Sequence, residues 1–208
     1  MAKLAIAVID YGAGNLHSVA KAFDKIGYPA CVTADPISIS EADAVVLPGV
    51  GAALDTVNGL TARALTTPIR ETLARGKPFL GVCIGLQVLF ERTEEEDVEC
   101  LGLLAGRVRR LPSGQKVPHM GWNQVLSQGP HPLLAEIPDG SNFYFVHSYF
   151  ADPGQETEVI ATTDYGIRFP SVVAKQNLVA TQFHPEKSGA LGLQIYRNFV
   201  ERIVRKSL

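Results

Sequence analysis

A cysteine between two glycines is the feature of this sequence that most indicates catalysis. Residues 81–85 have the sequence GVCIG and stand between a short apolar segment and a segment with helical spacing. Glycines two positions before and two positions after a nucleophile are typical of a tight strand-to-helix turn. The helix amides that follow would stabilise a thiolate on Cys83. The alternative is a cysteine that only packs in the core.

A histidine and a glutamate follow another apolar segment. His184 and Glu186 come directly after residues 178–183. A nucleophilic cysteine needs a base, and that base needs a group to orient it. His184 could take the thiol proton through one ring nitrogen while Glu186 holds the other. If this segment and residues 79–82 are parallel strands, their carboxyl ends meet at one edge of the sheet. We therefore predict a triad with Cys83 as its nucleophile.

Glycines also follow a third apolar segment. Gly49 and Gly51 flank Val50, between residues 44–47 and the start of a helical pattern. Glycines here would let backbone N–H groups point into a site and stabilise a developing oxyanion. A plain tight turn would use the same residues, but a triad nearby favours the oxyanion site.

Other kinds of chemistry are not indicated. Gly12 and Gly14 begin like a dinucleotide-binding motif, but His17 stands where its third glycine belongs. The five histidines lack metal-ligand spacing and the cysteines form no C-x-x-C pair, so we expect no metal and no cofactor. A net charge of −2 leaves no basic field for nucleic acid. No segment approaches the roughly 20 apolar residues of a membrane helix, so no membrane contact is expected.

The cysteines and the first apolar run bear on the compartment. Three cysteines at wide spacing do not make a disulfide framework. The apolar run at residues 4–9 is shorter than the apolar region of a signal peptide. We therefore expect a cytoplasmic protein. Cys31 and Cys100 lack the setting of Cys83, and we expect both to be packing residues.

The first half of the chain has the pattern of an α/β fold. Expected strands are residues 4–9, 29–33, 44–47 and 77–82. Expected helices are residues 18–26, 52–60, 68–74 and 84–91. This alternation predicts a mostly parallel open sheet flanked by helices. With no linker or repeat in 208 residues, we expect a single domain over residues 1–208.

The pattern changes from residue 101 onward. Short strand-like segments separated by turn residues are 107–111, 124–127, 142–150, 158–162, 172–174 and 178–183. They predict an antiparallel extension of the sheet in the second half, with a hairpin around residues 176–177. A last helix is expected over residues 191–206. The acidic run at residues 94–97 is expected to be a solvated surface loop.

Together these motifs resemble the class I, triad-type glutamine amidotransferases, whose fold is flavodoxin-like. That resemblance rests on residues 48–51, 81–87 and 182–186. Three further segments are similar to the glutaminase subunits of imidazole glycerol phosphate synthases, a subfamily that serves histidine biosynthesis. These segments are residues 9–16, 119–123 and 144–149. The motifs span nearly the whole chain. The one departure is Ile84, where leucine is commoner after the cysteine.

The resemblance implies a reaction and a role for each residue. Cys83 would attack the side-chain amide of glutamine, and His184 would protonate the departing ammonia. His184 would then activate the water that hydrolyses the glutamyl thioester, while Glu186 orients it. The residues that would line the glutamine pocket are Gly51, Gln87, His147, Ser148 and Tyr149.

The resemblance also implies a partner. Ammonia would pass directly into a separate cyclase subunit built as a (β/α)₈ barrel, with which this chain would form a heterodimer. A barrel of that kind needs roughly 250 residues, so this chain is too short to contain one. Free ammonia is mostly protonated at neutral pH and is then no nucleophile, so a sealed route would protect it.

Such a partnership calls for a gate, because hydrolysis without an acceptor wastes glutamine. We hypothesise that the backbone around Val50 is the gate, with a carbonyl instead of an N–H facing the oxyanion position at rest. Flanking glycines make such a peptide flip sterically easy. The oxyanion and gating residues would be Gly49, Val50, Gly51 and Ile84.

Three other functions remain open. The chain could be the glutaminase subunit of another amidotransferase, such as one serving pyridoxal phosphate, anthranilate or guanylate synthesis. A cysteine peptidase or other hydrolase would act on peptides or esters without a partner. A regulatory module that kept only the fold would normally lack one of the three triad residues, and all three are present.

Overall fold

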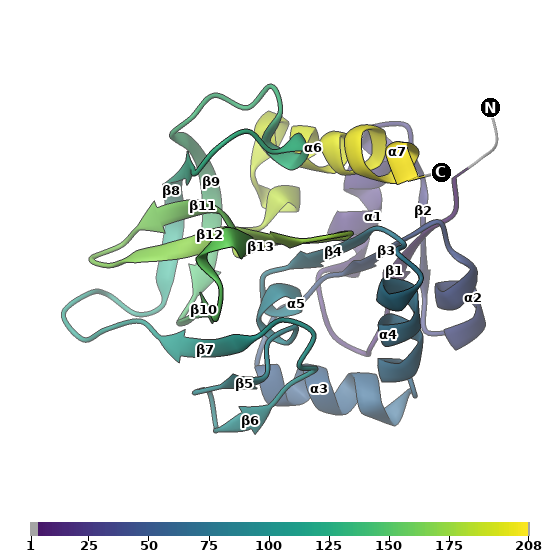
Figure 1. Cartoon of the computed structure of the whole chain (residues 1–208), viewed down its shortest axis with the longest axis horizontal. Helices are drawn as coiled ribbons and strands as arrows, with labels where there is room; N and C mark the ends of the chain where they lie inside the picture. Colours follow the sequence, from purple (N-terminus) through teal and green to yellow (C-terminus); the bar gives the residue numbers. More distant parts are fainter. Residues whose placement is uncertain (1–3, 208) are drawn as a thin grey trace.

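A nine-stranded sheet runs through the molecule and sets where the site forms (Figure 1). The computed structural model describes residues 4–207. The strands that pair in parallel are β1 (Ile6–Ile9), β2 (Ala30–Thr33), β3 (Ala44–Leu47), β4 (Phe79–Val82) and β13 (Leu178–Thr181). All but β2 are buried along their whole length, as their continuously apolar sequences predict. Because β4 and β13 are parallel neighbours, their carboxyl ends meet, which confirms the prediction made from residues 79–82 and 178–183.

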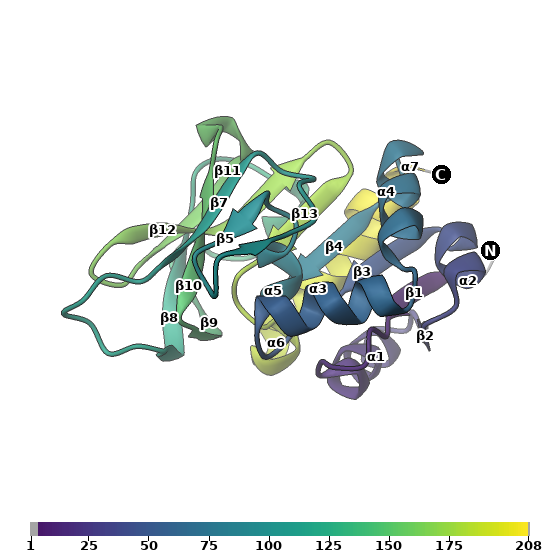
Figure 2. The ribbon, with the colours of Figure 1, turned by 90° about the horizontal axis from the view of Figure 1, so that it is seen from below.

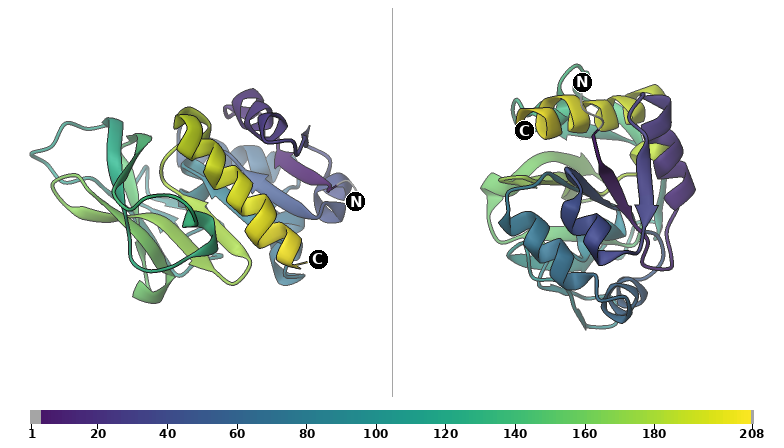
Figure 3. Two further views of the ribbon diagram at one scale, coloured as in Figure 1. Left: turned by 90° about the horizontal axis from the view of Figure 1, so that it is seen from above. Right: turned by 90° about the vertical axis from the view of Figure 1, so that its right-hand side faces the viewer.

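Helices cover both faces of the parallel strands. They are α1 (Leu16–Lys25), α2 (Pro36–Glu41), α3 (Ala53–Ala62), α4 (Thr66–Ala74), α5 (Ile84–Gln87), α6 (Gly189–Asn198) and α7 (Arg205–Ser207). Figures 1 and 3 show α1 and α6 on one face of the sheet, and Figure 1 shows α3 and α4 on the other. The rings of Phe23 on α1 and Tyr196 on α6 lie 4.8 Å apart and are fully buried, so the two helices share one core. The segment η4 (Phe199–Val204) continues α6 as a π-helix.

The sheet continues in antiparallel fashion beyond β13, as the second half of the sequence predicts. The added strands are β12 (Arg168–Lys175), β11 (Val159–Asp164), β8 (His119–Ser127) and β9 (Ser141–His147). The expected hairpin joins β12 to β13 around residues 176–177. Figure 2 shows these strands gathered at one end of the molecule, away from α1 and α2. The α/β fold class with an open mixed sheet is therefore confirmed.

Some expectations about the elements were wrong in detail. The predicted strand 142–150 is two strands, because the chain leaves the large sheet at Ser148 and continues in a second sheet. That four-stranded sheet was not expected, and it contains β10 (Tyr149–Pro153), β7 (Gly106–Arg110), β5 (Arg92–Thr93) and β6 (Val98–Glu99). The predicted helix 84–91 ends at Gln87. The acidic run at residues 94–97 forms the turn between β5 and β6 and is exposed except for the partly buried Glu95, so the expected solvated surface loop is confirmed.

Three short 3-10 turns complete the elements. They are η1 (Pro132–Leu134), η2 (Glu156–Glu158) and η3 (Pro185–Lys187). The expected single domain spans residues 1–208, of which residues 1–3 and 208 lie outside the described part. Within residues 4–207, no helix is both long and apolar enough to cross a membrane.

Candidate active site

Cys83 stands at the turn between β4 and α5, in a backbone conformation that few side chains adopt. Its φ is 55° and its ψ is −109°. Such a conformation persists only where the surrounding structure enforces it. The enforcing contact is close: a Cβ added at Gly85 would lie 1.9 Å from the carbonyl oxygen of Leu47. The glycines of this segment therefore let β3, β4 and α5 approach closely enough to hold the thiol at the sheet edge.

His184 and Glu186 lie at the end of the neighbouring strand, β13. Nδ1 of His184 is 2.8 Å from Oε1 of Glu186, and each side chain is only 1% exposed. A carboxylate accepts, so Nδ1 carries the proton and donates it. The Tyr196 hydroxyl donates to the other carboxylate oxygen of Glu186 at 3.4 Å. The imidazole is thereby held in one tautomer and one orientation.

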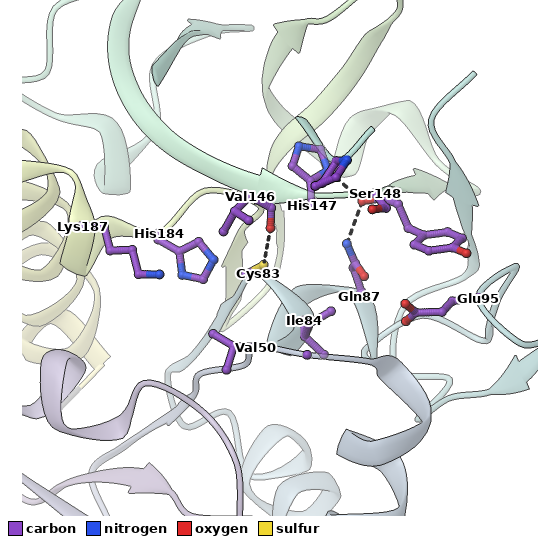
Figure 4. A pocket seen from close by; sticks show the side chains of 13 residues that line it. Val50, Cys83, Ile84, Gln87, Glu95, Val146, His147, Ser148, His184 and Lys187 are labelled. Carbon is purple, nitrogen blue, oxygen red and sulfur yellow. Dashed lines mark hydrogen bonds between the residues drawn. The ribbon is translucent and has the colours of Figure 1, made fainter. Parts of the chain in front are cut away.

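The free nitrogen of His184 completes the triad geometry. Nε2 is buried without a hydrogen bond, so its lone pair is available toward Cys83 (Figure 4). Burial disfavours the charged imidazole, but the charges of Cys83 and Glu186 outweigh it and raise the pKa of His184 to about 10. His184 is therefore favoured in its charged form beside Cys83. The Cys83 sulfur also lies 3.8 Å from the carbonyl oxygen of Val146 and from Nε2 of Gln182.

A pocket of about 350 Å³ opens above the cysteine. Its wall contains the sequence-predicted residues Val50, Gly51, Cys83, Ile84, Gln87, His147, Ser148, Tyr149 and His184. Glu186 is not part of this wall and contacts His184 from behind. Gly49 also lies outside the wall, where a Cβ would come within 2.7 Å of the Ile84 Cβ. The structure thus brings all the predicted residues to one place.

Gln87 presents one free acceptor in this pocket. Its Nε2 donates to the Tyr149 carbonyl at 2.7 Å and to Oε1 of Gln182 at 3.1 Å, which uses both of its hydrogens. Its Oε1 is buried and has no hydrogen-bond partner. A buried unpaired oxygen costs free energy unless a ligand supplies a donor. Gln87 is therefore set to accept from an N–H group in the pocket.

The ring of His147 is not available for such a role. Nδ1 is 2.8 Å from the Tyr149 carbonyl oxygen and Nε2 is 2.9 Å from Nδ1 of His119. Figure 4 shows the imidazole pointing away from Cys83. His147 therefore contributes its backbone to the pocket wall, and Ser148 and Tyr149 continue that wall.

The predicted oxyanion segment lies over a buried tyrosine. The Tyr11 hydroxyl is buried and makes no hydrogen bond of ordinary geometry. Burial raises the pKa of Tyr11, and the Thr56 side chain and the Val50 backbone N–H oppose that rise. Gly51 has a φ of +94°, a conformation that glycine adopts without steric cost, and a Cβ added there would meet no atom within 4 Å.

Several site residues had no clear signal in the sequence. Gln182 precedes His184 by two positions, yet only the packing against α5 shows that it joins Gln87 to Cys83. Glu95 belongs to the acidic run but turns back into the pocket, where it accepts from the backbone N–H of Ala53 at 2.8 Å. Three more residues line the pocket without a clear signal in the sequence: Pro118, Val146 and Lys187.

The remaining cysteines behave differently from each other. Cys31 is exposed, so the expectation that it packs in the core was wrong. Its strand, β2, lies at the edge of the sheet and has one open side. Cys100 is partly buried, and burial raises its pKa to about 11. Within residues 4–207, no three His, Cys, Asp or Glu side chains converge as a metal site would require.

An exposed apolar face adjoins the pocket. Met120 and Trp122 on β8 are 61% and 58% exposed, unusual for such side chains. The Trp122 ring lies edge-on to Tyr144 of β9, and Lys187 places its ammonium 5.8 Å from the Tyr144 ring centre. Lys187 and Val146, the cross-strand neighbour of Met120, both line the pocket. This face, which we term the β8–β9 outer face, is continuous with the site.

Comparisons with known proteins point in one direction. The model of the family "Glutamine amidotransferase class-I" matches residues 7–203. A protein of Dehalococcoides mccartyi (strain CBDB1) named imidazole glycerol phosphate synthase subunit HisH is 55% identical over 195 residues, or 93% of this chain and 95% of the relative. A protein of the same name from Moorella thermoacetica is 52% identical over 199 residues, or 95% of each chain.

Solved structures with much lower identity share the fold. PurLQS from Thermotoga maritima matches with a TM-score of 0.77 at 18% identity, over 97% of this chain and 99% of that chain. A GMP synthase subunit from Thermoplasma acidophilum matches with a TM-score of 0.74, also at 18% identity, over 100% of this chain and 96% of that chain. These two likenesses concern the fold alone.

Proposed function

This chain belongs to the class-I glutamine amidotransferase family, and from that premise we propose that it hydrolyses glutamine with Cys83, His184 and Glu186 as its catalytic triad. The ammonia serves an imidazole glycerol phosphate synthase, the enzyme named for its 55% identical relative. The observation that carries the proposal is the buried His184–Glu186 pair, whose free Nε2 lies on the Cys83 side of the same pocket.

The reaction follows from the proton positions. The Cys83 thiolate attacks the side-chain carbonyl carbon of glutamine, and the negative charge passes to the carbonyl oxygen. His184 gives its Nε2 proton to the leaving nitrogen, so the C–N bond breaks and ammonia departs from a thioester. The now neutral His184 takes a proton from water, whose oxygen attacks the thioester carbon. The C–S bond breaks, glutamate is released, and Cys83 returns to the thiolate beside protonated His184. Glu186 keeps Nδ1 protonated throughout.

The pocket matches the two ends of the substrate. The free Oε1 of Gln87 would accept from the α-ammonium group of glutamine. The backbone of His147, Ser148 and Tyr149 would line the remainder of the molecule, together with Gly51. The N–H groups of Val50 and Ile84 are candidates for the oxyanion site. Gly49 and Gly51 flank Val50, and Gly51 has a positive φ of 94°, which supports a resting state in which the Val50 N–H is turned away.

We further propose that the partner is a (β/α)₈ cyclase subunit in a heterodimer, which receives the ammonia through a closed channel. The β8–β9 outer face is where we place it, because exposed Trp122 and Met120 adjoin the pocket through Val146 and Lys187. Aromatic and methionine side chains are enriched in such contacts. The synthase would then be a lyase as a whole. The cytoplasmic location expected from the sequence stays a prediction.

The test is glutamate formation from glutamine by the purified chain, alone and with a cyclase subunit carrying its ribonucleotide ligand. We expect low activity alone and a strong rise with the liganded partner. Cys83→Ala should abolish both, whereas the matched variant Cys100→Ala should leave both unchanged. Glutaminase activity at the full rate without the partner would show that the backbone around Val50 is not a gate. Activity on peptides or esters in place of glutamine would contradict the proposal itself.

The docking face has its own variant. Trp122→Ala removes an exposed side chain and should leave the fold and basal activity intact while weakening partner binding about tenfold or more. Titration of the cyclase subunit by calorimetry measures this directly. Unchanged affinity would place the partner on another face.

A further inference from the structure

Two histidines on neighbouring strands form a buried pair beside the glutamine pocket. His119 of β8 and His147 of β9 are direct cross-strand partners in the antiparallel register. Their side chains point to the same face of the sheet, and they are 3% and 5% exposed. Nδ1 of His119 and Nε2 of His147 are 2.9 Å apart. Neither residue is in the triad, and the reaction proposed above uses neither ring.

The direction of every proton in this pair is determined by its two ends. At one end the Tyr149 carbonyl can only accept, so Nδ1 of His147 donates to it. At the other end the Asn123 amide nitrogen lies 3.2 Å from Nε2 of His119. That amide also donates to the Asp164 carbonyl at 2.9 Å, which identifies the atom as the nitrogen.

Only one arrangement of protons satisfies both ends. Asn123 donates to Nε2 of His119, His119 donates from Nδ1 to Nε2 of His147, and His147 donates from Nδ1 to the Tyr149 carbonyl. An added proton on either ring would set two N–H groups against each other. Burial agrees with this arrangement, because it lowers the pKa of His119 to about 4 and that of His147 to about 3.

The last acceptor in this series of hydrogen bonds belongs to a residue of the glutamine pocket. The Tyr149 carbonyl accepts from His147 and also from Nε2 of Gln87 at 2.7 Å. It therefore sets the orientation of the Gln87 amide, whose second hydrogen goes to Gln182 and whose oxygen is free. If the carbonyl turns, Gln87 loses the contact that aims its Oε1.

We propose that His119 is a positioning residue for the glutamine pocket: through its Nδ1–H it holds His147 in a single tautomer, and His147 in turn holds the Tyr149 carbonyl that orients Gln87. The inference rests on the proposed function of this pocket. It goes beyond that function because His119 does not line the pocket and contacts no atom proposed to react.

A purely structural role for His119 is the competing explanation. Its ring stacks on Tyr165 at 4.0 Å and on Phe145 at 5.0 Å between ring centres, so it also packs in an aromatic cluster. Loss of packing would lower stability whichever polar atom the replacement keeps. Loss of positioning depends on one atom, the donor at Nδ1.

Two replacements of similar size separate these roles. In His119→Asn the amide nitrogen can take the place of Nδ1 and still donate to His147. In His119→Gln the amide reaches the place of Nε2, so the contact with Asn123 remains and the donor to His147 is lost. We expect His119→Asn to keep KM for glutamine within about twofold, and His119→Gln to raise KM roughly tenfold, the effect of one buried hydrogen bond. The value of kcat should change less than KM in both.

The assay uses the chain in complex with its liganded cyclase partner, and thermal unfolding of each variant shows whether it folds. An equal rise of KM in both variants, or a fall in kcat alone, would overturn the proposal. Absence of glutaminase activity in the unsubstituted complex would instead contradict the proposed function.

A second measurement does not depend on activity. Nitrogen-15 NMR of the unsubstituted chain at pH 7 should show His119 and His147 both neutral with the proton on Nδ1. In His119→Asn the His147 signals should keep this pattern. A proton on Nε2 of His147 in the unsubstituted chain would overturn the inference, even if the glutamine variant fails to fold.

Discussion

The parallel and antiparallel halves of this molecule hold the site in different ways. In the parallel half, close backbone packing fixes the nucleophile: Gly85 lies against the Leu47 carbonyl, and Cys83 has a positive φ. In the antiparallel half, the pocket is shaped by side-chain hydrogen bonds between strands, above all those of His119 and His147. Rigid backbone positions the chemistry, whereas a polar network on a sheet positions the substrate.

This difference has a cause in the strand types. The parallel strands other than β2 are buried on both faces, so close packing holds the turn at Cys83 in place. The strands β8 and β9 have one inner and one outer face, as the alternation from His119 to Trp122 shows. That leaves an outer face for a partner and an inner face for the histidine pair. Both faces adjoin the pocket, the outer face through Val146 and the inner face through His147.

The largest expected difference between the two halves comes from a pair of glycine substitutions. Gly85→Ala would place a Cβ 1.9 Å from the Leu47 carbonyl oxygen, so we expect a loss of more than about 4 kcal/mol in stability, or no folding. Gly121→Ala in β8 has open space but a φ of +137°, so backbone strain alone should cost about 1–3 kcal/mol. Urea unfolding measures both. Similar losses would show that close packing does not distinguish the halves.

The triad carboxylate offers the next largest effect. In Glu186→Gln the hydrogen bond to Nδ1 remains possible but the charge is gone, so the raised pKa of His184 should fall. The form that protonates ammonia is then lost at a lower pH, and the basic limb of the glutaminase pH profile should move to lower pH. We expect a rate loss of about 10²-fold at pH 8. A basic limb that moves upward, or does not move, would contradict the role given to Glu186.

The histidine pair makes the antiparallel half sensitive to acid. The unfolded chain binds protons at His119 and His147 near pH 6.5, whereas the folded chain binds them only near pH 4 and pH 3. Stability should therefore fall as pH drops from about 6.5 to 4, by up to about 1.4 kcal/mol per pH unit for each histidine. His119→Asn should lessen this slope.

The control for the acid experiment is His17→Asn, a substitution of an exposed histidine on α1. Denaturant unfolding at a series of pH values gives the slopes. If His17→Asn and His119→Asn change the slope equally, burial of the pair is not the source of the acid sensitivity.

The smallest expected effect concerns strain at the nucleophile. Cys83→Gly and Cys83→Ala both remove the thiol, but only glycine adopts a φ of 55° without steric cost. Strain of this kind costs of order 1–3 kcal/mol, part of which is offset by the greater freedom of glycine in the unfolded chain. We therefore expect the glycine variant to be about 1 kcal/mol more stable than the alanine variant. Equal stability in thermal unfolding would mean that the turn is not strained.

The sequence by itself was enough to predict the parallel half and the residues proposed as the triad. Short apolar runs, each followed by glycine or a polar residue, are enough to predict strands β1, β3, β4 and β13 and the residues at their ends. Because side chains at the carboxyl ends of parallel strands must share one edge, local patterns around Cys83 and His184 already predict their meeting. The resemblance to known glutaminases then identified the pocket residues.

Only the tertiary structure decided the second sheet, the return of Glu95 to the pocket and the pairing of His119 with His147. Residues 142–150 have the uniform pattern of one strand, and the break at Ser148 depends on which neighbour each part meets. The two histidines stand 28 positions apart, and nothing near either one predicts the register that sets them side by side. Contacts between antiparallel strands come from pairing at long range, which local spacing does not encode.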